Sequence, residues 1–248
     1  MKKSFSYLTL KKIIKIFKNP LIEPPDMEED FLDIYRSCYK YTMTSIERMY
    51  SLYTAVKYIS ENGLKGDICE CGVWKGGSMM LAAKTLLKLK DKNRKIYLYD
   101  TYTGMSRPTK KDIDFENIPA EKEWRKRQRE NFNEWAYCPL EETKNNLLLT
   151  GYPEKKLVFI KGNVEETIPD IVPNQISLLR LDTDWYKSTY HELKYLYPRI
   201  IKQGVLIIDD YGHFKGAKEA TEQYFKENNK KVLLNRIDYS GRIILKVD

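Results

Sequence analysis

The hydrophobic pattern of the chain becomes regular at about residue 66. From there on, short apolar runs alternate with longer stretches whose apolar residues recur at helical spacing. We expect strands at 66–73, 95–100, 157–162, 176–182 and 205–209. We expect helices at 77–90, 187–202 and 215–228, and a short helical stretch that ends at Asp170. Strands that alternate with helices predict a mostly parallel sheet covered on both faces.

Both ends of the chain depart from this alternation. The segments 231–235 and 242–247 flank the turn sequence DYSG and predict an antiparallel hairpin. Residues 27–62 are expected to be helical, because Tyr, Met and Leu fall on one face without a helix breaker. The fold class that we expect is α/β, with a mostly parallel seven-stranded sheet, an antiparallel C-terminal hairpin and N-terminal helices.

Residues 101–156 are too long for a simple crossover between two strands. They begin with a polar loop and predict helices at about 119–135 and 139–150. We interpret this segment as a helical insertion, or lid, over a ligand site.

The N-terminal segment is basic and amphipathic. Its apolar residues recur at helical spacing, and Pro20, Pro24 and Pro25 indicate a linker behind it. We therefore divide the chain into an extension and linker, 1–40, and a domain, 41–248. Docking of residues 1–19 on a membrane surface is one interpretation; packing on the domain itself or on a second subunit is the one we favour.

The net charge of +8 is concentrated in that same segment. Six of the positive charges lie in the first twenty residues: Lys2, Lys3, Lys11, Lys12, Lys15 and Lys18. No basic stripe remains elsewhere, so we expect no nucleic-acid partner. The 4 cysteines form no CxxC pair and no Cys/His cluster, which favours reduced thiols and a cytoplasmic location. A transmembrane helix is not expected, because no run of apolar residues is long enough to span a bilayer.

Acidic residues end four of the five expected parallel strands. They are Glu70, Asp100, Asp182 with Asp184, and Asp209 with Asp210. Ligands of open α/β sheets bind beyond the carboxyl ends of the strands, so these acids should surround a ligand site. A basic chain would not be expected to gather acids there by composition alone.

A glycine turn follows the first strand in the segment ECGVWKGGSMM. Gly72 suits a tight turn, Gly76 and Gly77 allow a close approach to the backbone, and Ser78 can donate a hydrogen bond or cap the helix. The turn matches neither GxGxxG nor a P-loop, and tight packing alone would also explain it. Asp100 is placed to accept ribose hydroxyls. The negative charge of Glu70 and its neighbours favours the cationic S-adenosylmethionine (SAM) over a pyrophosphate cofactor such as NAD.

The aspartates of the last two parallel strands suggest a metal site. Asp182 and Asp184 share a face if their strand continues, and Asp209 and Asp210 end the neighbouring strand. Carboxylates this close repel one another unless a cation compensates, and Mg²⁺ or another hard divalent ion prefers oxygen ligands. Such an ion lowers the pKa of a bound hydroxyl, and Asp184 or His213 could then take the proton. Helix N-capping is the alternative for any single aspartate.

Six segments, in this order, resemble the macrocin O-methyltransferase family over about residues 42–225: TMTSIERMYSL, ECGVWKGGSMM, YDTYTGM, GNVEETIP, LRLDTDWYKSTYHELKYLYPRI and GVLIIDDYGHFKGAKEA. The resemblance implies a Rossmann-like class I methyltransferase fold, frequently dimeric, so we expect a homo-oligomer. It also implies SAM- and Mg²⁺-dependent methylation of sugar hydroxyls, often on natural-product glycosides.

The resemblance also implies roles for single residues. It places Asp182, Asp209 and Asp210 on the metal and suggests Asp184 as the general base. The SAM contacts that it implies are Thr44, Ser45, Glu70, Gly72, Ser78, Asp100, Asn163 and Val164, beside Gly77 of the glycine turn. The chain departs from the family pattern at Thr183, where glycine is expected, at Trp185, and at His213-Phe214, all in the acceptor region. Aromatic residues of the insertion would suit a sugar ring or pack among themselves: Tyr102, Trp124, Trp135 and Tyr137.

The function that we expect is therefore a SAM- and divalent-metal-dependent O-methyltransferase. Its acceptor would be a saccharide hydroxyl on a glycoside, a nucleotide sugar or a surface-glycan precursor. A catechol-type enzyme with a phenolic small-molecule acceptor uses the same metal chemistry. A metal-dependent hydrolase on a similar sheet, and a non-catalytic protein that docks on membranes through its N-terminus, are the alternatives from other classes.

Overall fold

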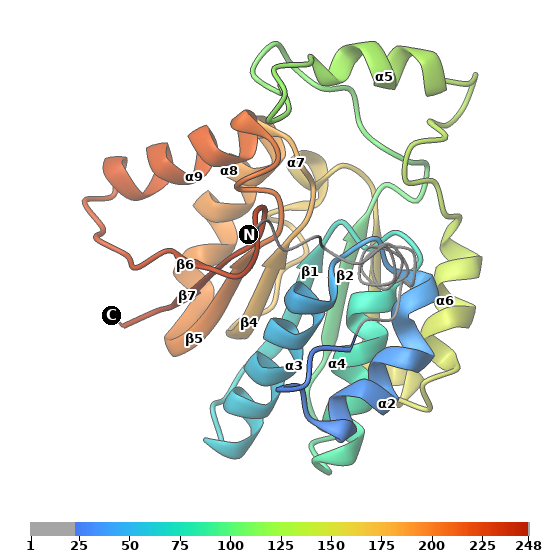
Figure 1. Cartoon of the computed structure of the whole chain (residues 1–248), viewed down its shortest axis with the longest axis vertical. Coiled ribbons are helices and arrows are strands. Elements are labelled where there is room, and N and C mark those ends of the chain that lie inside the picture. Colours follow the sequence, from blue (N-terminus) through green and yellow to red (C-terminus); the bar gives the residue numbers. More distant parts are fainter. Residues whose placement is uncertain (1–22, 248) are drawn as a thin grey trace, which may run out of the picture.

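The computed structural model describes residues 23–247. A seven-stranded sheet with the order β3-β2-β1-β4-β5-β7-β6 forms its centre (Figure 1). The strands are β1 (Asp67–Cys71), β2 (Ile96–Asp100), β3 (Leu157–Lys161), β4 (Ile176–Leu181), β5 (Ile200–Ile208), β6 (Asn235–Arg236) and β7 (Arg242–Leu245). The first five are parallel, and β7 pairs antiparallel with both β5 and β6. The expected α/β fold with its antiparallel C-terminal hairpin is confirmed.

Alternation along the strands divides the core between the two faces of the sheet. Ile68 of β1 packs in one hydrophobic cluster, whereas Cys69 and Cys71 pack in the other. In β5, Val205 and Ile207 belong to the first cluster and their neighbours to the second. The parallel strands are mostly apolar because both faces of the sheet are covered. The 4 cysteines are buried and unbridged, as expected for reduced thiols.

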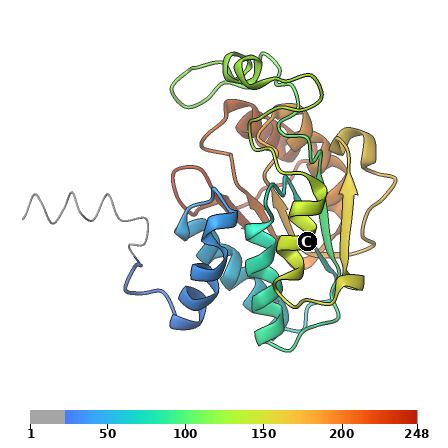
Figure 2. The same cartoon turned by 90° about the vertical axis from the view of Figure 1, so that its right-hand side faces the viewer.

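Helices cover both faces of the sheet (Figures 1 and 2). One face carries α2 (Glu29–Cys38), α3 (Ile46–Glu61), α4 (Gly77–Lys88) and α6 (Leu140–Leu148). The other carries α7 (Val164–Thr167), α8 (Tyr186–Leu196) and α9 (Lys215–Glu227). A further helix, α5 (Ala120–Arg127), lies apart from both layers (Figure 1). Single 3₁₀ turns occur at Tyr39–Tyr41, Glu154–Lys156 and Tyr197–Arg199.

Several expected boundaries were wrong. The single helix expected at 27–62 is interrupted between α2 and α3, because Thr42 is extended and the Ser45 side chain caps α3. The helix expected to reach residue 202 ends at Leu196, and β5 begins at Ile200, directly after a 3₁₀ turn that contains Pro198. The hairpin strand expected at 231–235 is reduced to Asn235–Arg236. Helices α5 and α6 are shorter than expected, and most of 101–139 is irregular.

The described part of the expected extension 1–40 packs in the core. Phe31 and Cys38 of α2 are fully buried in the cluster that α3 and α4 also line. The amphipathic helix and the membrane contact expected for residues 1–19 lie outside the described residues. Among residues 23–247, no helix is both long enough and apolar enough to cross a bilayer.

The insertion is clamped to the loops that follow β4 and β5. Asp112, which is 1% exposed, accepts the Tyr186 backbone N–H at 2.7 Å and the Thr109 backbone N–H at 2.6 Å. The Trp185 indole N–H donates to the Ser106 carbonyl at 2.9 Å. Trp185 and Phe214 pack with Ala120 in a third hydrophobic cluster. These contacts fix the insertion beside the carboxyl edge of the sheet.

Candidate active site

The turn after β1 is shaped by Gly72 and held by Asp100. Gly72 has a φ of +86°, and a Cβ atom there would lie 2.0 Å from the Asp182 carbonyl oxygen, so only glycine fits. One carboxylate oxygen of Asp100 accepts the backbone N–H groups of Val73 at 2.7 Å and Trp74 at 2.9 Å. Burial raises the pKa of Asp100, and these backbone N–H groups oppose that rise.

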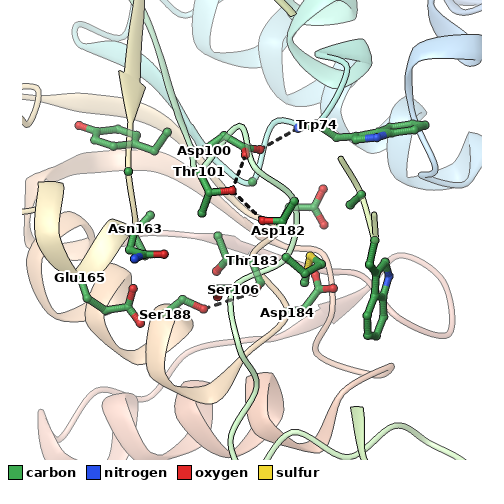
Figure 3. Close-up of a pocket in the computed structure, with 18 of the residues that line it drawn as sticks. Trp74, Asp100, Thr101, Ser106, Asn163, Glu165, Asp182, Thr183, Asp184 and Ser188 are labelled. Carbon is green, nitrogen blue, oxygen red and sulfur yellow. Dashed lines mark hydrogen bonds between the residues drawn. The ribbon is translucent and has the colours of Figure 1, made fainter. Parts of the chain in front are cut away.

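A first cavity opens beside this turn (Figure 3). Gly72 and Asp100 line it from the ends of β1 and β2, and Asn163 and Val164 line it from the loop after β3. Ser106 and Trp135 of the insertion close another side. The cavity thus lies at the carboxyl ends of the strands, where ligands of parallel sheets bind.

A second cavity adjoins the first. It is lined by Thr44 and Arg48 near the start of α3, by Gly77 and Ser78 at the start of α4, and by His213. The two cavities share five residues, which are Met43, Trp74, Trp135, Asp182 and Asp184. They therefore meet at the aspartates that follow β4.

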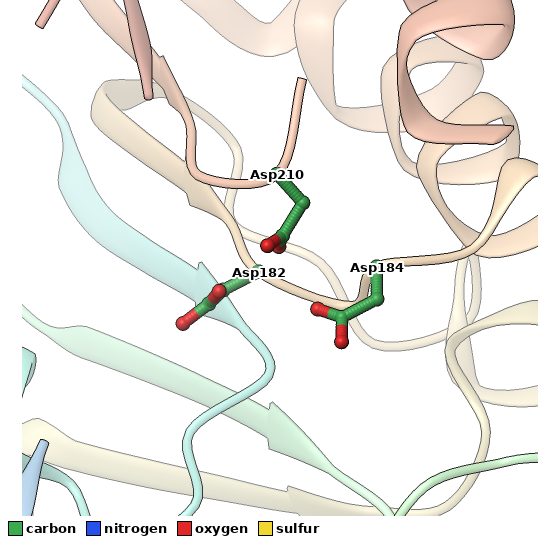
Figure 4. Close-up of side chains that lie close together, drawn as sticks. All are labelled: Asp182, Asp184 and Asp210. Carbon is green, nitrogen blue, oxygen red and sulfur yellow. The ribbon is translucent and has the colours of Figure 1, made fainter. Parts of the chain in front are cut away.

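Three carboxylates face one another at this junction (Figure 4). One oxygen from each of Asp182, Asp184 and Asp210 lies within 4.8 Å of the other two. Burial raises the pKa of Asp184 to about 8, and the negative charges of Asp182 and Asp209 add to the rise. Burial and the neighbouring carboxylates also raise the pKa values of Asp182 and Asp210. The cluster is therefore destabilised when every member is ionised, unless a cation joins it.

The donor set of this cluster fits a hard divalent cation. Its members are all carboxylate oxygens, which Mg²⁺ prefers. Within the described part of the chain, no N–H or O–H group donates to the buried Asp210 Oδ2 atom. A buried carboxylate oxygen without a donor is costly, and a metal ion would satisfy it.

Asp209 lies outside this cluster of three. It is 2% exposed, and its carboxylate forms ion pairs with Arg180 and Arg48. Its backbone carbonyl accepts the Ser240 hydroxyl at 2.6 Å. The assignment of Asp209 as a metal ligand thus stays a prediction. Binding a metal ion would require the Asp209 carboxylate to release one of its two arginine partners.

Arg180 is the centre of a buried ion-pair network. Its guanidinium contacts Glu70 at 2.7 Å and Asp182 at 2.7 Å, in addition to Asp209. It also donates to the Thr44 hydroxyl at 2.9 Å. Burial raises the pKa of Glu70 to about 7, and the Arg180 charge opposes that rise. Arg180 joins the ends of β1, β4 and β5 to the segment before α3.

Most of the predicted site residues line a cavity. They are Thr44, Gly72, Gly77, Ser78, Asp100, Asn163, Val164, Asp182, Asp184, Asp209, Asp210 and His213. Ser45 and Glu70 line neither cavity. Ser45 caps α3 and donates to Asp238 at 2.7 Å, and Glu70 is 1% exposed behind Arg180. Their expected contacts with SAM stay predictions that the geometry does not support.

The remaining candidates are distributed differently. Burial lowers the pKa of His213 at the rim of the second cavity. A nitrogen of His191, the other histidine of the chain, lies 2.8 Å from the Ile168 carbonyl oxygen. Of the four aromatic residues expected near a sugar ring, only Trp135 lines either of these two cavities. The Tyr102 hydroxyl donates to the Leu98 carbonyl at 3.1 Å, and Trp124 and Tyr137 pack within the insertion.

Residues that bear side chains adopt positive φ angles at the junction. Trp74 has a φ of 48° and Asp184 a φ of 66°. Such backbone conformations are costly for most side chains and concentrate at functional sites. In Asp184 this conformation turns the carboxylate toward Asp210 (Figure 4).

Sequence reasoning missed Arg180 and Arg48. Arg180 stands inside the apolar run LLRLD, and a charge in the middle of a buried strand requires a partner, so a signal was present. Arg48 lies on an amphipathic helix where a solvated arginine is ordinary, and nothing in the sequence distinguishes it.

Glu192 supports the loop that carries the aspartates. It is 0% exposed, and it accepts the Thr183 hydroxyl at 2.9 Å. The Thr183 hydroxyl thus anchors this loop to α8. Burial raises the pKa of Glu192 to about 8, because its charged form finds little compensation.

We expect a Glu192→Gln variant to flatten the dependence of stability on pH. The pKa is raised in the folded chain, so the unfolded chain releases this proton first, from its ordinary pKa of 4.5 upward. The free energy of unfolding should therefore fall as pH rises from about 4.5 to about 8, by about 1.4 kcal/mol for each unit of pKa difference. Urea unfolding at several pH values measures this slope.

The control for this experiment is Glu154→Gln, at an exposed glutamate. It should keep the slope of the wild type. Glu70 and Asp184 contribute slopes of the same sign, so the Glu192→Gln protein should retain part of the dependence. An unchanged slope in the Glu192→Gln protein would contradict a buried, protonated Glu192.

The sequence of the chain matches known proteins. The sequence profile of the macrocin-O-methyltransferase (TylF) family matches residues 26–246. The chain is 28% identical over 184 residues to 8-demethyl-8-(2,3-dimethoxy-alpha-L-rhamnosyl)-tetracenomycin-C 4'-O-methyltransferase from Streptomyces olivaceus, covering 74% of this chain and 67% of that protein. It is 26% identical over 234 residues to demethyldecarbamoylnovobiocin O-methyltransferase from Streptomyces niveus, covering 89% of this chain and 86% of that protein.

Solved structures share the fold over nearly the whole chain. The O-methyltransferase NovP superposes with a TM-score of 0.74 at 23% identity, covering 97% of this chain and 99% of that one. A calicheamicin methyltransferase superposes with a TM-score of 0.62 at 16% identity, covering 98% of this chain and 94% of that one. At these identities the likeness supports the class I methyltransferase fold.

Proposed function

The chain belongs to the macrocin O-methyltransferase family and is a SAM-dependent O-methyltransferase, and from this premise we propose that it methylates a saccharide hydroxyl with the help of a divalent cation. The observation that carries the proposal is the junction of two cavities at Asp182, Asp184 and Asp210. A methyl donor in one cavity and an acceptor in the other would meet beside these carboxylates.

The first cavity is the proposed SAM site. Asp100 would accept hydrogen bonds from the ribose hydroxyls. Gly72 would leave room for the ligand, and Asn163 and Val164 would line the other side. Thr44, Gly77 and Ser78 line the adjoining second cavity, and the amino acid part of SAM would reach across the junction to them. The acids near the junction would attract the positively charged sulfonium of SAM. They would repel the negative charge of a pyrophosphate cofactor.

The second cavity is the proposed acceptor site. The relatives from Streptomyces are named for a rhamnosyl-tetracenomycin and for demethyldecarbamoylnovobiocin, and the rhamnosyl group in the first name motivates the choice of a sugar-bearing acceptor here. The carboxylates at the inner end of this cavity can accept hydrogen bonds from sugar hydroxyls. Glycosides, nucleotide sugars and surface-glycan precursors all carry such hydroxyls.

Asp182 and Asp210 would hold the divalent cation, and Asp209 would join them after releasing Arg48. When bound, Mg²⁺ or another divalent cation would neutralise these carboxylates and lower the pKa of an approaching hydroxyl. The fit rests on the oxygen-only donor set and on the Asp210 oxygen that no described donor reaches.

The chain's own residues would then align and deprotonate the acceptor. Asp184 lies at the junction of the cavities, so its carboxylate is placed to take the hydroxyl proton, with His213 as the second candidate. The acceptor oxygen forms its bond to the methyl carbon while the carbon–sulfur bond breaks, and the proton stays on the base. Fixed positions for both reactants supply much of the acceleration.

The experiment that tests the function supplies labelled SAM with two acceptor sets, simple sugar glycosides and simple catechols. We expect transfer to a sugar and loss of transfer on chelation, with recovery when Mg²⁺ is added. An Asp210→Ala protein should bind the SAM product normally and lose at least about a hundredfold in rate, because it removes a ligand of the cation. Glu154→Gln, at an exposed glutamate that lines neither cavity, is the control and should keep full activity.

Two outcomes would contradict the proposal. Transfer to catechols alone would indicate a phenolic acceptor. Full activity in the presence of chelator, or in the Asp210→Ala protein, would exclude the metal role. The proposal also includes a homo-oligomer and a cytoplasmic location, and light scattering of the full chain measures the first of these.

A further inference from the structure

We propose that Phe115, His213 and Tyr239 form an aromatic rim that binds the apolar face of an uncharged sugar ring of the acceptor. This inference rests on the proposed function and goes beyond it by naming where the acceptor ring lies and which charge class it has.

The rim is assembled from three segments that are far apart in the sequence. Phe115 comes from the insertion, His213 from the loop after β5, and Tyr239 from the turn between β6 and β7. The Phe115 ring lies 5.2 Å from the His213 ring and 5.8 Å from the Tyr239 ring, centroid to centroid. The Tyr239 hydroxyl lies 2.9 Å from His213 Nδ1, within hydrogen-bond distance.

The rim is fixed relative to the aspartates. The Ser240 carbonyl, next to Tyr239, accepts the Gly212 backbone N–H at 2.9 Å, and the Ser240 hydroxyl donates to the Asp209 carbonyl. A Cβ atom at Gly212 would lie 1.8 Å from the Tyr239 carbonyl oxygen, so the turn and the loop are in direct contact. The His213 backbone N–H donates to the Asp210 carbonyl at 3.0 Å.

The insertion side is fixed in the same way. Asp114 forms an isolated antiparallel bridge with Phe214, and the Lys215 backbone N–H donates to the Ile113 carbonyl at 2.8 Å. Asp114 Oδ1 accepts the backbone N–H groups of Glu116 and Ile118, which rigidifies the turn around Phe115. A ring bound on the rim would therefore stay in register with the reacting hydroxyl.

The rim exposes apolar surface at the mouth of a polar cavity. Phe115 is 53% exposed and Tyr239 is 50% exposed, while His213 and Tyr239 line the second cavity. Covering such aromatic faces is favourable, and a pyranose offers a flat face of C–H groups with hydroxyls at its edge. The C–H face would lie on the rim, and an edge hydroxyl would reach the carboxylates.

The charges of the second cavity favour an uncharged ring. Arg48 is the only lysine or arginine among the lining residues that the structure describes, and it is paired with Asp209 and with Asp238, the latter at 3.0 Å. The same cavity carries Asp182, Asp184, Asp209 and Asp210. A single divalent cation would compensate two of these four negative charges, and Arg48 would keep its ion pair with Asp238 even if Asp209 turned to the cation. A diphosphate would therefore still meet net negative charge among the cavity residues. A glycoside fits this cavity better than a nucleotide sugar.

The test compares methyl glycosides of 6-deoxyhexoses with the matching thymidine-diphosphate sugars as acceptors. We expect the wild type to have the higher kcat/KM with the methyl glycosides. Phe115→Ala and Tyr239→Ala should each raise the acceptor KM about tenfold, because a stacked ring contributes about that factor. Their kcat and their affinity for the SAM product should change less than twofold.

Two kinds of variant separate stacking from a general loss of structure. Phe115→Tyr and Tyr239→Phe keep the aromatic faces and should restore the KM to within about threefold of the wild type. Tyr137→Ala removes a ring of the insertion that is 38% exposed but lines neither cavity, and it should leave the acceptor KM unchanged.

The outcomes distinguish this inference from the proposed function. A normal acceptor KM in both alanine variants, with transfer to sugars intact, would overturn the rim alone. A higher kcat/KM for the thymidine-diphosphate sugars would overturn the uncharged acceptor. Transfer to catechols and to none of the sugars would overturn the proposed function, and the rim with it.

Discussion

An Asp184→Asn enzyme should bind SAM as tightly as the wild type and transfer the methyl group about 10²–10⁴ times more slowly. Asparagine has nearly the same shape as aspartate but cannot take a proton, so the change isolates the proposed base. Asp184 is the residue best placed for that role, because it lies where the two cavities meet and faces Asp210 (Figure 4).

The measurement separates binding from chemistry. Calorimetry with the SAM product gives the affinity of the first cavity, and single-turnover kinetics give the rate of transfer. Glu154→Gln makes the same change from carboxylate to amide at an exposed residue before β3, outside both cavities, and should be indistinguishable from the wild type.

Other results would change the assignment in defined ways. Lost affinity for the SAM product would give Asp184 a structural role, consistent with its φ of 66°. A normal rate would transfer the role of base to His213, and His213→Ala would then show the larger effect. A loss of rate in both variants, larger for Asp184→Asn, is the result that the geometry favours.

Replacing Arg180 with leucine should destabilise the fold by about 3–5 kcal/mol. Arg180 is 2% exposed and is surrounded by Glu70, Asp182 and Asp209. Leucine would leave these carboxylates buried without their counter-charge, which costs far more than the loss of the ion pairs themselves. Chemical denaturation measures the change, and the midpoint of thermal unfolding should fall with it.

Arg36 provides a matched control on the surface. It also pairs with three carboxylates, those of Glu23, Glu29 and Asp33, but its side chain is 39% exposed. Exposed ion pairs contribute about 0–1 kcal/mol, so Arg36→Leu should be nearly neutral. The loss of stability in Arg180→Lys should lie between those of Arg180→Leu and Arg36→Leu. Lysine keeps the positive charge but cannot contact three carboxylates as the planar guanidinium does. Equal losses of stability in Arg36→Leu and Arg180→Leu would contradict the expectation that removing a buried counter-charge costs more than removing an exposed one.

The strand and helix pattern was readable from the sequence because it is set by local rules. Apolar runs such as VLIID must be buried on both faces, and the amphipathic stretches between them must cover those faces, so the parallel sheet followed. The acids at the strand ends were readable for the same reason, since the carboxyl ends of parallel strands lie at one edge. Errors fell at boundaries, where caps and turns such as Ser45 and Pro198 decide.

Tertiary contacts decided how those acids are used. The sequence places Asp209 and Asp210 side by side, yet one carboxylate is held by Arg180 and Arg48 while the other faces Asp182 and Asp184. The same holds for the rim, where Phe115 meets His213 and Tyr239 only because the insertion and the hairpin turn are clamped to one loop. A helix or strand forms because of hydrogen bonding and burial within its own segment, so its residues alone predict it. Ion pairs and ring contacts form between segments that are distant in the sequence, and their strength depends on how far the surrounding segments exclude water.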